Sequence, residues 1–183
     1  MKLGCVLSQT TVDKDGHPVR DADSSTYVST FEPVQDFGSL LYAGPMRRGV
    51  ESARQLIIIG DGAAWIWNLA AEQFPRAVEI VDLYQAREHL FNLGRLVMPT
   101  VNEKRWFASR LGELDRGDIE SLLAAFNALP ESKPDEVHTA LAYFENNQER
   151  MRYGRFRGLG LFIGSVTVEA ADVRRSFTSG SSS

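Results

Sequence analysis

The sequence contains 183 residues, of which 43% are hydrophobic and 24% are charged, and this composition is typical of a soluble globular protein rather than a disordered one. The length suits one core, or one core with an inserted subdomain, and the formal net charge of −4 gives no general attraction to nucleic acid. The single cysteine, Cys5, excludes an internal disulfide and a multi-cysteine zinc site, and no apolar run approaches the ~20 residues that span a bilayer, so we expect a cytoplasmic protein with no zinc and no membrane contact.

The beginning of the chain predicts a β-hairpin with a long loop. Residues 2–12 and 24–31 are rich in β-branched and aromatic side chains, and residues 13–23 between them are dense in turn-forming residues. Residues 32–50 then carry apolar side chains at helical spacing, which predicts a helix.

A strand, helix, strand unit is predicted next. Residues 56–59 form an unalternating apolar run, typical of a strand covered on both faces, and residues 77–84 form a second strand after a helix that begins near Ala63. A unit of this length implies a right-handed crossover and a parallel pair of strands. Within the helix we expect Trp65 to belong to the buried stripe and Trp67, which cannot share its face, to lie at the surface.

Two acids, Asp61 and Asp82, follow these two strands. The carboxyl ends of parallel strands are where ligands bind in open α/β sheets. Asp61 lies between Gly60 and Gly62, which would allow a sharp turn and the close approach of a ligand or a second chain. Asp61 could cap the following helix, or it could be a ligand of Mg²⁺, and the acid alone does not decide between these roles.

The chain from residue 84 to about 153 predicts helices without an intervening strand. His89 lies in the first of them, and its only neighbour at metal-binding spacing is Gln85, so we expect a surface or capping role for this histidine. The predicted helices cover residues 84–96, 102–114, 118–129 and 135–153.

Four arginines lie close together at the end of the helical region. A solvated helix end that complements the helix dipole explains them, and so does a contact with a phosphate backbone, because arginine is always charged and binds phosphate in bidentate fashion. The residues are Arg150, Arg152, Arg155 and Arg157, with Tyr153 and Phe156 interleaved.

Two long stretches resemble the catalytic region of bacterial insertion-sequence transposases of the ISKra type, which belong to the DDE, RNase H-like superfamily. They are IIIGDGAAWIWNLAAEQFPRAVEIVDLYQAREHL and NQERMRYGRFRGLGLFIGSVTVEA, and the resemblance extends from residue 2 to about residue 170. It implies that Asp61, in its GDGA context, corresponds to the family's second catalytic acid, and that Glu169, after a Gly-Ser pair, corresponds to its catalytic Glu.

The resemblance also implies a fold and a function. The fold would be α/β, an RNase H-like mixed sheet with an all-α insertion between the second and third catalytic acids. Asp61 and Glu169 would bind Mg²⁺ or Mn²⁺ for cleavage and strand transfer of DNA, with transposon ends and target DNA as partners and self-association into an oligomer. The arginine run would contact the DNA.

The sequence departs from the family at both ends. The family's first catalytic Asp lies on a strand before the one that starts at Lys2, and the sequence supplies no such strand. After Glu169 the family continues as a long helix, whereas this sequence becomes AADVRRSFTSGSSS, and Gln85 replaces a family histidine. We therefore expect a fragment that lacks the first strand and is inactive alone.

The expected domain organisation follows from this comparison with the family. It comprises a partial RNase H-like core over residues 1–83, a helical insertion over 84–153, a return to the core over 154–172 and a disordered tail over 173–183. Two other interpretations stay open. One is a non-catalytic DNA-binding or interaction module that uses the arginine run, and the other is a chain that folds poorly because the missing strand leaves an exposed sheet edge.

Overall fold

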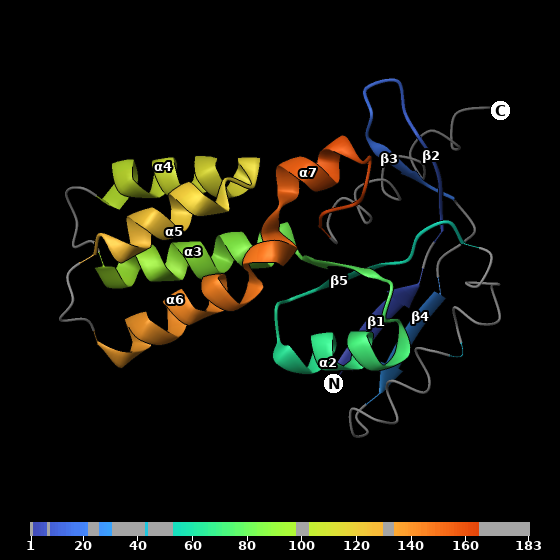
Figure 1. Ribbon diagram of the computed structural model, residues 1–183, viewed down its shortest axis with the longest axis horizontal. Helices are drawn as coiled ribbons and strands as arrows, with labels where there is room; N and C mark the ends of the chain where they lie inside the picture. The colour runs from blue at the N-terminus through green and yellow to red at the C-terminus, as the bar shows by residue number, and fades with distance from the viewer. Residues whose placement is uncertain are drawn as a thin grey trace, which may run out of the picture. The chain divides into compact units, whose positions relative to one another are not determined.

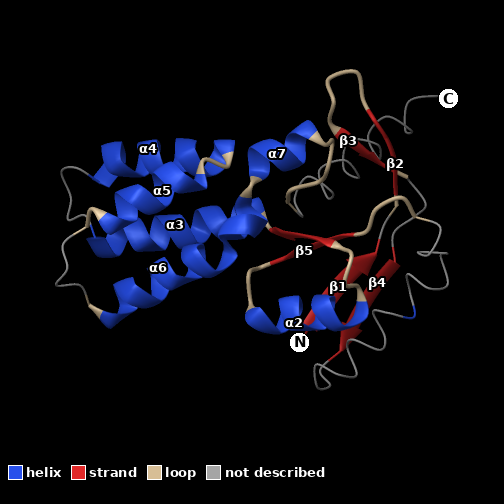
Figure 2. Ribbon diagram, viewed as in Figure 1, coloured by secondary structure: helices blue, strands red, loops and turns tan. Residues whose placement is uncertain are grey.

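The computed structural model is a mixed α/β protein that is mostly helical, with small two-stranded sheets (Figure 2). The chain divides into two compact units, one comprising Met1–Ile58, Ala63–Glu79 and Val166–Ser183, and the other comprising Ile59–Gly62 and Ile80–Ser165. Among the residues described, no helix has both the length and the apolar character needed to cross a membrane. The structure describes residues 2–6, 8–21, 26–30, 43, 53–97, 103–129 and 134–164.

The first four strands confirm the predicted hairpin in outline. The outer strands pair in antiparallel fashion, with Lys2 opposite Thr30. The end of the expected first strand, residues 9–12, instead pairs with residues 18–20 of the expected loop and forms a second, shorter hairpin. The helix predicted for residues 32–50 lies outside the described residues, apart from residue 43. The strands are β1 (Lys2–Val6), β2 (Gln9–Val12), β3 (Pro18–Arg20) and β4 (Thr26–Thr30).

The predicted strand, helix, strand unit is present. Two hydrogen bonds join its strands, from Val78 N to Leu56 O at 2.9 Å and from Asp82 N to Gly60 O at 2.7 Å. From the first bond to the second, the donor residue and the acceptor residue both move four positions forward in the chain. The two strands therefore run parallel, as the sequence predicts. The three elements are β5 (Ile57–Gly60), α2 (Ala64–Gln73) and β6 (Val78–Val81).

The expected burial of the two tryptophans of α2 is wrong. Trp67 is buried, with 6% of its surface exposed, together with Leu69 and Ala70, whereas Trp65 is only partly buried. Which ring points inward depends on the direction in which the preceding turn starts the helix, and the helical repeat carries no information about that.

Residues 83–151 contain the four helices predicted for this region, and the last of them, predicted over residues 135–153, divides into an α-helix and a 3-10 helix. A further short helix, which was not predicted, begins at Tyr153. The first four helices contact one another in the closed order α3, α4, α5, α6 and back to α3, which gives a four-helix arrangement (Figure 1). Its core contains Leu90, Leu93, Leu122, Phe126 and Phe144. The elements are α3 (Leu83–Val97), α4 (Glu103–Arg116), α5 (Ile119–Asn127), α6 (Asp135–Asn147), the 3-10 helix η2 (Gln148–Met151) and α7 (Tyr153–Gly158).

The turn between α4 and α5 packs closely against the start of α7. Gly117 has a φ of 71°, which ends α4, and a Cβ atom there would lie 2.5 Å from the backbone nitrogen of Tyr153. Asp118 caps α5 by accepting a hydrogen bond from Ser121 N at 3.2 Å. The backbones of the end of α4 and the start of α7 therefore approach too closely for a side chain at residue 117.

Candidate functional site

Asp61 lies directly after β5, and its side chain is exposed. The N-cap of α2 is Ala63, in an extended conformation and without a side-chain cap. The N-cap position of α2 therefore belongs to Ala63 and not to Asp61.

The turn after Asp61 requires glycine for two reasons. Gly62 has a φ of 96°, a backbone conformation that side chains disfavour. In addition, a Cβ atom at this position would lie 2.5 Å from Cε2 of Tyr143 and 2.8 Å from its hydroxyl oxygen. The sequence suggested a glycine that lets a ligand or second chain approach, and the group that approaches is a tyrosine ring of α6.

Two side chains of α6 donate hydrogen bonds to the main chain of this turn. The Tyr143 hydroxyl donates to the carbonyl oxygen of Asp61 at 2.9 Å, and Asn147 Nδ2 donates to the carbonyl oxygen of Gly62 at 3.3 Å. The same Asn147 nitrogen donates to the carbonyl oxygen of Tyr143 at 2.9 Å. His89 of α3 stacks on the Tyr143 ring, with 3.7 Å between ring centroids and 18° between planes. We call Tyr143, Asn147 and His89 the turn clamp.

Burial and charge around the turn clamp shift the pKa values of its two titratable members. Burial, followed by the negative charges of Asp61 and Asp82, raises the pKa of the Tyr143 hydroxyl. Burial lowers the pKa of His89, although the charges of Glu88 and Asp61 oppose the shift. Both groups are therefore neutral at pH 7. The nearby carboxylates consequently face no positive charge from the clamp, and their negative potential favours a bound cation.

Asp82 follows β6 and is almost fully buried, with 5% of its surface exposed. Its Oδ1 atom accepts a hydrogen bond from Tyr84 N at 2.9 Å, and its carbonyl oxygen accepts one from Ala86 N at 2.9 Å. These bonds are those of an N-cap, so Asp82 starts α3.

After the helical region the chain returns to the end of β6. Leu83 N donates a hydrogen bond to the carbonyl oxygen of Ile163 at 2.9 Å. A Cβ atom at Gly164 would lie 3.0 Å from the ring of Tyr84 and 3.6 Å from Oδ1 of Asp82. Glu169, the acid that the sequence places five residues further on, lies outside the described residues.

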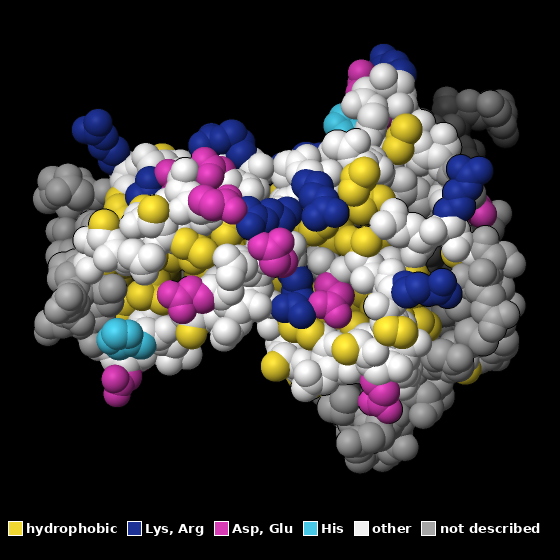
Figure 3. All heavy atoms as spheres, viewed as in Figure 1, with side chains coloured by type: hydrophobic (Ala, Val, Ile, Leu, Met, Phe, Trp, Pro, Cys, Tyr) yellow, Lys and Arg dark blue, Asp and Glu magenta, His cyan; other side chains and the backbone are white. Residues whose placement is uncertain are grey.

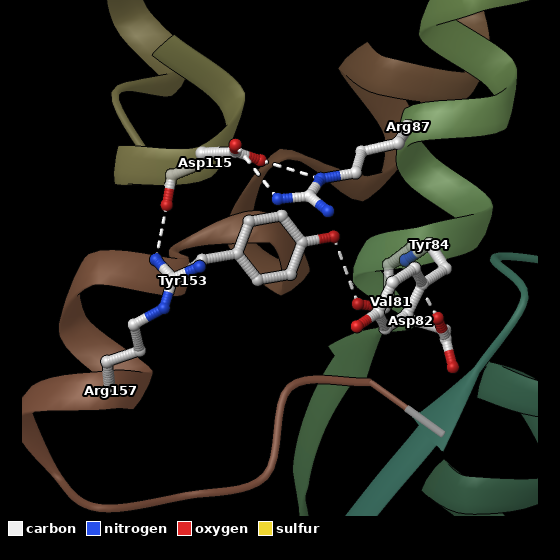
Figure 4. A network of polar contacts seen from close by, with 7 residues as sticks. All are labelled: Val81, Asp82, Tyr84, Arg87, Asp115, Tyr153 and Arg157. Atoms are coloured by element: carbon white, nitrogen blue, oxygen red, sulfur yellow. Dashed lines mark hydrogen bonds and ion pairs between the residues drawn. The ribbon is translucent and has the colours of Figure 1, made fainter. Parts of the chain in front are cut away.

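A buried tyrosine bonds to the end of β6, and two arginines join neighbouring helices to the end of α4 (Figure 4). The Tyr153 hydroxyl, fully buried, donates to the carbonyl oxygen of Val81 at 3.0 Å. Arg87 of α3 makes a bidentate ion pair with Asp115 of α4, with both N–O distances at 2.9 Å, and Arg157 of α7 donates to the Asp115 carbonyl oxygen. Sequence analysis identified Tyr153 only as an aromatic residue within the arginine run, because nothing in a local pattern indicates a partner 72 positions away.

The predicted DNA-binding arginines differ in how far neighbouring side chains hold them. Arg152 bridges Glu120 at 2.5 Å and Glu149 at 2.8 Å, and these bonds raise the pKa of its guanidinium group. Arg150 donates to a helix carbonyl oxygen of α6 at 3.2 Å, and Arg155 is exposed. On the face seen in Figure 3, basic and acidic side chains are interspersed over the helices rather than gathered into one basic patch.

A second group of residues with metal-ligand chemistry lies in the turn between β2 and β3. Ligand atoms of Asp13, Asp15 and His17 all lie within 4.8 Å of one another, and all three residues are exposed. Asp13 Oδ1 accepts hydrogen bonds from the backbone nitrogens of Asp15 at 2.9 Å and of His17 at 2.8 Å. These bonds are those of an Asx turn, and they account for the clustering without an ion.

Comparison of the chain with protein-family models, curated proteins and solved structures gives no match.

Proposed function

We propose that the chain forms part of the active site of a cytoplasmic DDE-type DNA transposase with an RNase H-like arrangement. The observation that carries the proposal is the return of the chain, at Ile163 and Gly164, to the carboxyl end of β6 beside Asp82. Asp61 lies at the carboxyl end of the adjacent parallel strand. By the resemblance to the transposases, Glu169, which lies outside the described residues, would complete the acidic site together with Asp61.

The described residues suit a divalent cation at this edge. Asp61 offers an exposed carboxylate at the end of a strand, in a turn whose backbone two side chains hold. Carboxylate oxygens are the ligands that Mg²⁺ and Mn²⁺ prefer. Asp61 and Glu169 would hold the ions, which in phosphodiester transfer activate the attacking oxygen and stabilise the leaving oxygen.

The chain's own residues would bind and orient the DNA phosphate. Asp61 would fix the cation at the sheet edge, and the exposed guanidinium of Arg155 would contact the phosphate backbone. The sequence supplies two of the three acids that the family uses, so we expect the 183-residue chain to bind a divalent cation weakly and to transfer no strands by itself.

Titration of the chain with Mn²⁺, followed by calorimetry, tests the site. We expect Asp61→Asn to abolish the binding and Asp13→Asn to leave it unchanged. The Asp13 variant is the matched control, because it makes the same chemical change in the other group with metal-ligand chemistry. If Asp13→Asn abolishes the binding and Asp61→Asn does not, the ion binds in the β2–β3 turn and the proposed site is wrong.

A strand-transfer assay with Mg²⁺ or Mn²⁺ tests the expected inactivity. Robust activity of the isolated chain that Asp61→Asn abolishes would contradict the expected inactivity and would support the assignment of Asp61. Activity that Asp61→Asn leaves intact would contradict the site itself.

A further inference from the structure

We propose that the helical region positions the catalytic acid, with Tyr143 and Asn147 of α6, and His89 of α3, acting as positioning residues for Asp61. This inference rests on the proposed function, because it assigns a purpose to the turn clamp within that site. It gives the helical region a part in metal binding, in addition to its place in the chain between Asp61 and Glu169.

The hydrogen bonds of the clamp reach two consecutive peptide groups. Tyr143 holds the carbonyl oxygen of Asp61, and Asn147 holds the carbonyl oxygen of Gly62. Two fixed peptide planes in succession restrict the backbone dihedrals between them. Those dihedrals belong to Gly62, and the first of the two planes also contains the Cα atom of Asp61. The clamp therefore fixes the point from which the Asp61 side chain extends and so limits where its carboxylate can lie.

Packing holds the clamp itself in place. Asn147 is buried, with 3% of its surface exposed, and its bond to the carbonyl oxygen of Tyr143 ties the two donors together. The Tyr143 ring has Gly62 and His89 as close neighbours, with the His89 ring stacked on it. A ring held in this way cannot withdraw its hydroxyl from Asp61 without losing both contacts.

The geometry of the clamp suits a positioning role. Tyr143 acts on the main chain of Asp61, so it affects the carboxylate through orientation. Metal affinity depends strongly on ligand placement, because a misplaced ligand cannot complete the coordination geometry that the ion demands. Loosening the turn should therefore weaken metal binding even though the ligand itself is unchanged.

The test compares Tyr143→Phe with Tyr153→Phe in the full chain. Each change removes one phenol hydroxyl that donates to a main-chain carbonyl oxygen, at Asp61 in the first case and at Val81 in the second. Two quantities are measured: the Mn²⁺ dissociation constant, and the NMR order parameter of the Gly62 amide, which reports backbone motion without any metal. A thermal melt of each variant ensures that the measurements are made on folded protein.

We expect Tyr143→Phe to weaken Mn²⁺ binding by up to about tenfold, since one hydrogen bond contributes roughly that factor. We also expect it to lower the Gly62 order parameter from about 0.85, the value of rigid backbone, toward about 0.6. Tyr153→Phe should change neither the Mn²⁺ dissociation constant nor the Gly62 order parameter, even if it lowers the melting temperature more than Tyr143→Phe does.

An unchanged order parameter in Tyr143→Phe would overturn the clamp, and a lowered order parameter with unchanged Mn²⁺ affinity would overturn its effect on the metal site. Failure of the proposed function looks different. The proposed function is wrong if the Asp61→Asn variant binds Mn²⁺ as tightly as the parent chain does, or if the parent chain binds no Mn²⁺. Either result would also overturn the part of the inference that concerns metal binding. The order parameter still decides whether α6 holds the turn.

Discussion

Two Asp-Gly pairs in this molecule share a local sequence and differ in what holds them. Gly16 and Gly62 both have positive φ, 81° and 96°, and each follows an exposed Asp. A Cβ atom at Gly16 would meet nothing within 4 Å, whereas one at Gly62 would meet the Tyr143 ring. The first turn is closed by its own neighbour, Asp13, and the second by side chains more than 80 positions away. The dipeptide sets the backbone, but distant packing determines whether the acid is held.

Substituting alanine for each glycine should give the largest difference between the two turns. Gly16→Ala should cost about 1–2 kcal/mol, the strain of a side chain at positive φ. Gly62→Ala adds an overlap with the Tyr143 ring, which should raise the loss to about 2–5 kcal/mol. Urea unfolding followed by circular dichroism measures both losses.

A double variant separates the two causes at Gly62. In a Tyr143→Ala background the overlap is gone, so Gly62→Ala should cost only the backbone strain and the two losses should not add. Additive losses, or equal losses at Gly16 and Gly62, would mean that the ring does not restrict the second turn.

Alkaline pH should destabilise the unit that contains the clamped turn. Burial, with help from neighbouring negative charges, raises the pKa of Tyr143 and Tyr153 above the ordinary value of 10.0. The folded state then retains protons that the unfolded state loses. Stability is therefore complete below about pH 10 and falls as the pH rises further, by up to about 1.4 kcal/mol per pH unit for each tyrosine.

Urea unfolding between pH 8 and pH 11 measures this effect. Tyr143→Phe and Tyr153→Phe should each make the decline less steep. The β2–β3 turn has no tyrosine among residues 9–20, so the conformation of Gly16 should not follow the titration. A decline that neither variant changes would assign the effect to other groups.

Removing each aspartate should also distinguish the two turns, with a smaller effect. Asp13→Ala removes the acceptor for two backbone donors, so it should lower the NMR order parameter of the Gly16 amide. Asp61→Ala leaves the main-chain carbonyl oxygens that Tyr143 and Asn147 bind, so the order parameter of Gly62 should not change. A mobile Gly62 in Asp61→Ala would show that the carboxylate, and not α6, holds the turn.

The smallest expected effect concerns the arginine run, in which Arg152 forms ion pairs with Glu120 and Glu149 whereas Arg155 is exposed. Arg155→Ala should weaken binding to duplex DNA modestly and reduce the slope of log affinity against log salt by about 1, the contribution of one phosphate contact. Arg152→Ala should instead cost up to about 1 kcal/mol of stability, because Arg152 bridges Glu120 and Glu149 at a partly exposed site. Salt titrations and urea unfolding separate these outcomes, and identical salt slopes for Arg155→Ala and the parent would remove Arg155 from the interface.

Local patterns in the sequence predicted most of the described elements. The apolar run before Asp61 gave β5, and helical spacing gave α3 to α6, because the side chains that define these periodicities are neighbours in the chain. The parallel pairing of β5 with β6 followed from the length of the connection between them. The orientation of Trp65 and Trp67 did not follow, because it depends on the direction in which α2 leaves its turn.

The sequence by itself determined that Asp61 ends a strand and that the flexible residue after it permits a sharp turn. Only the tertiary structure brought Tyr143 and Asn147 onto that turn and paired Tyr153 with Val81. The physical reason is range. Backbone preference and hydrophobic spacing act over a few neighbouring residues, whereas a hydrogen bond across 82 positions exists only after the helices have packed and fixed both partners in space.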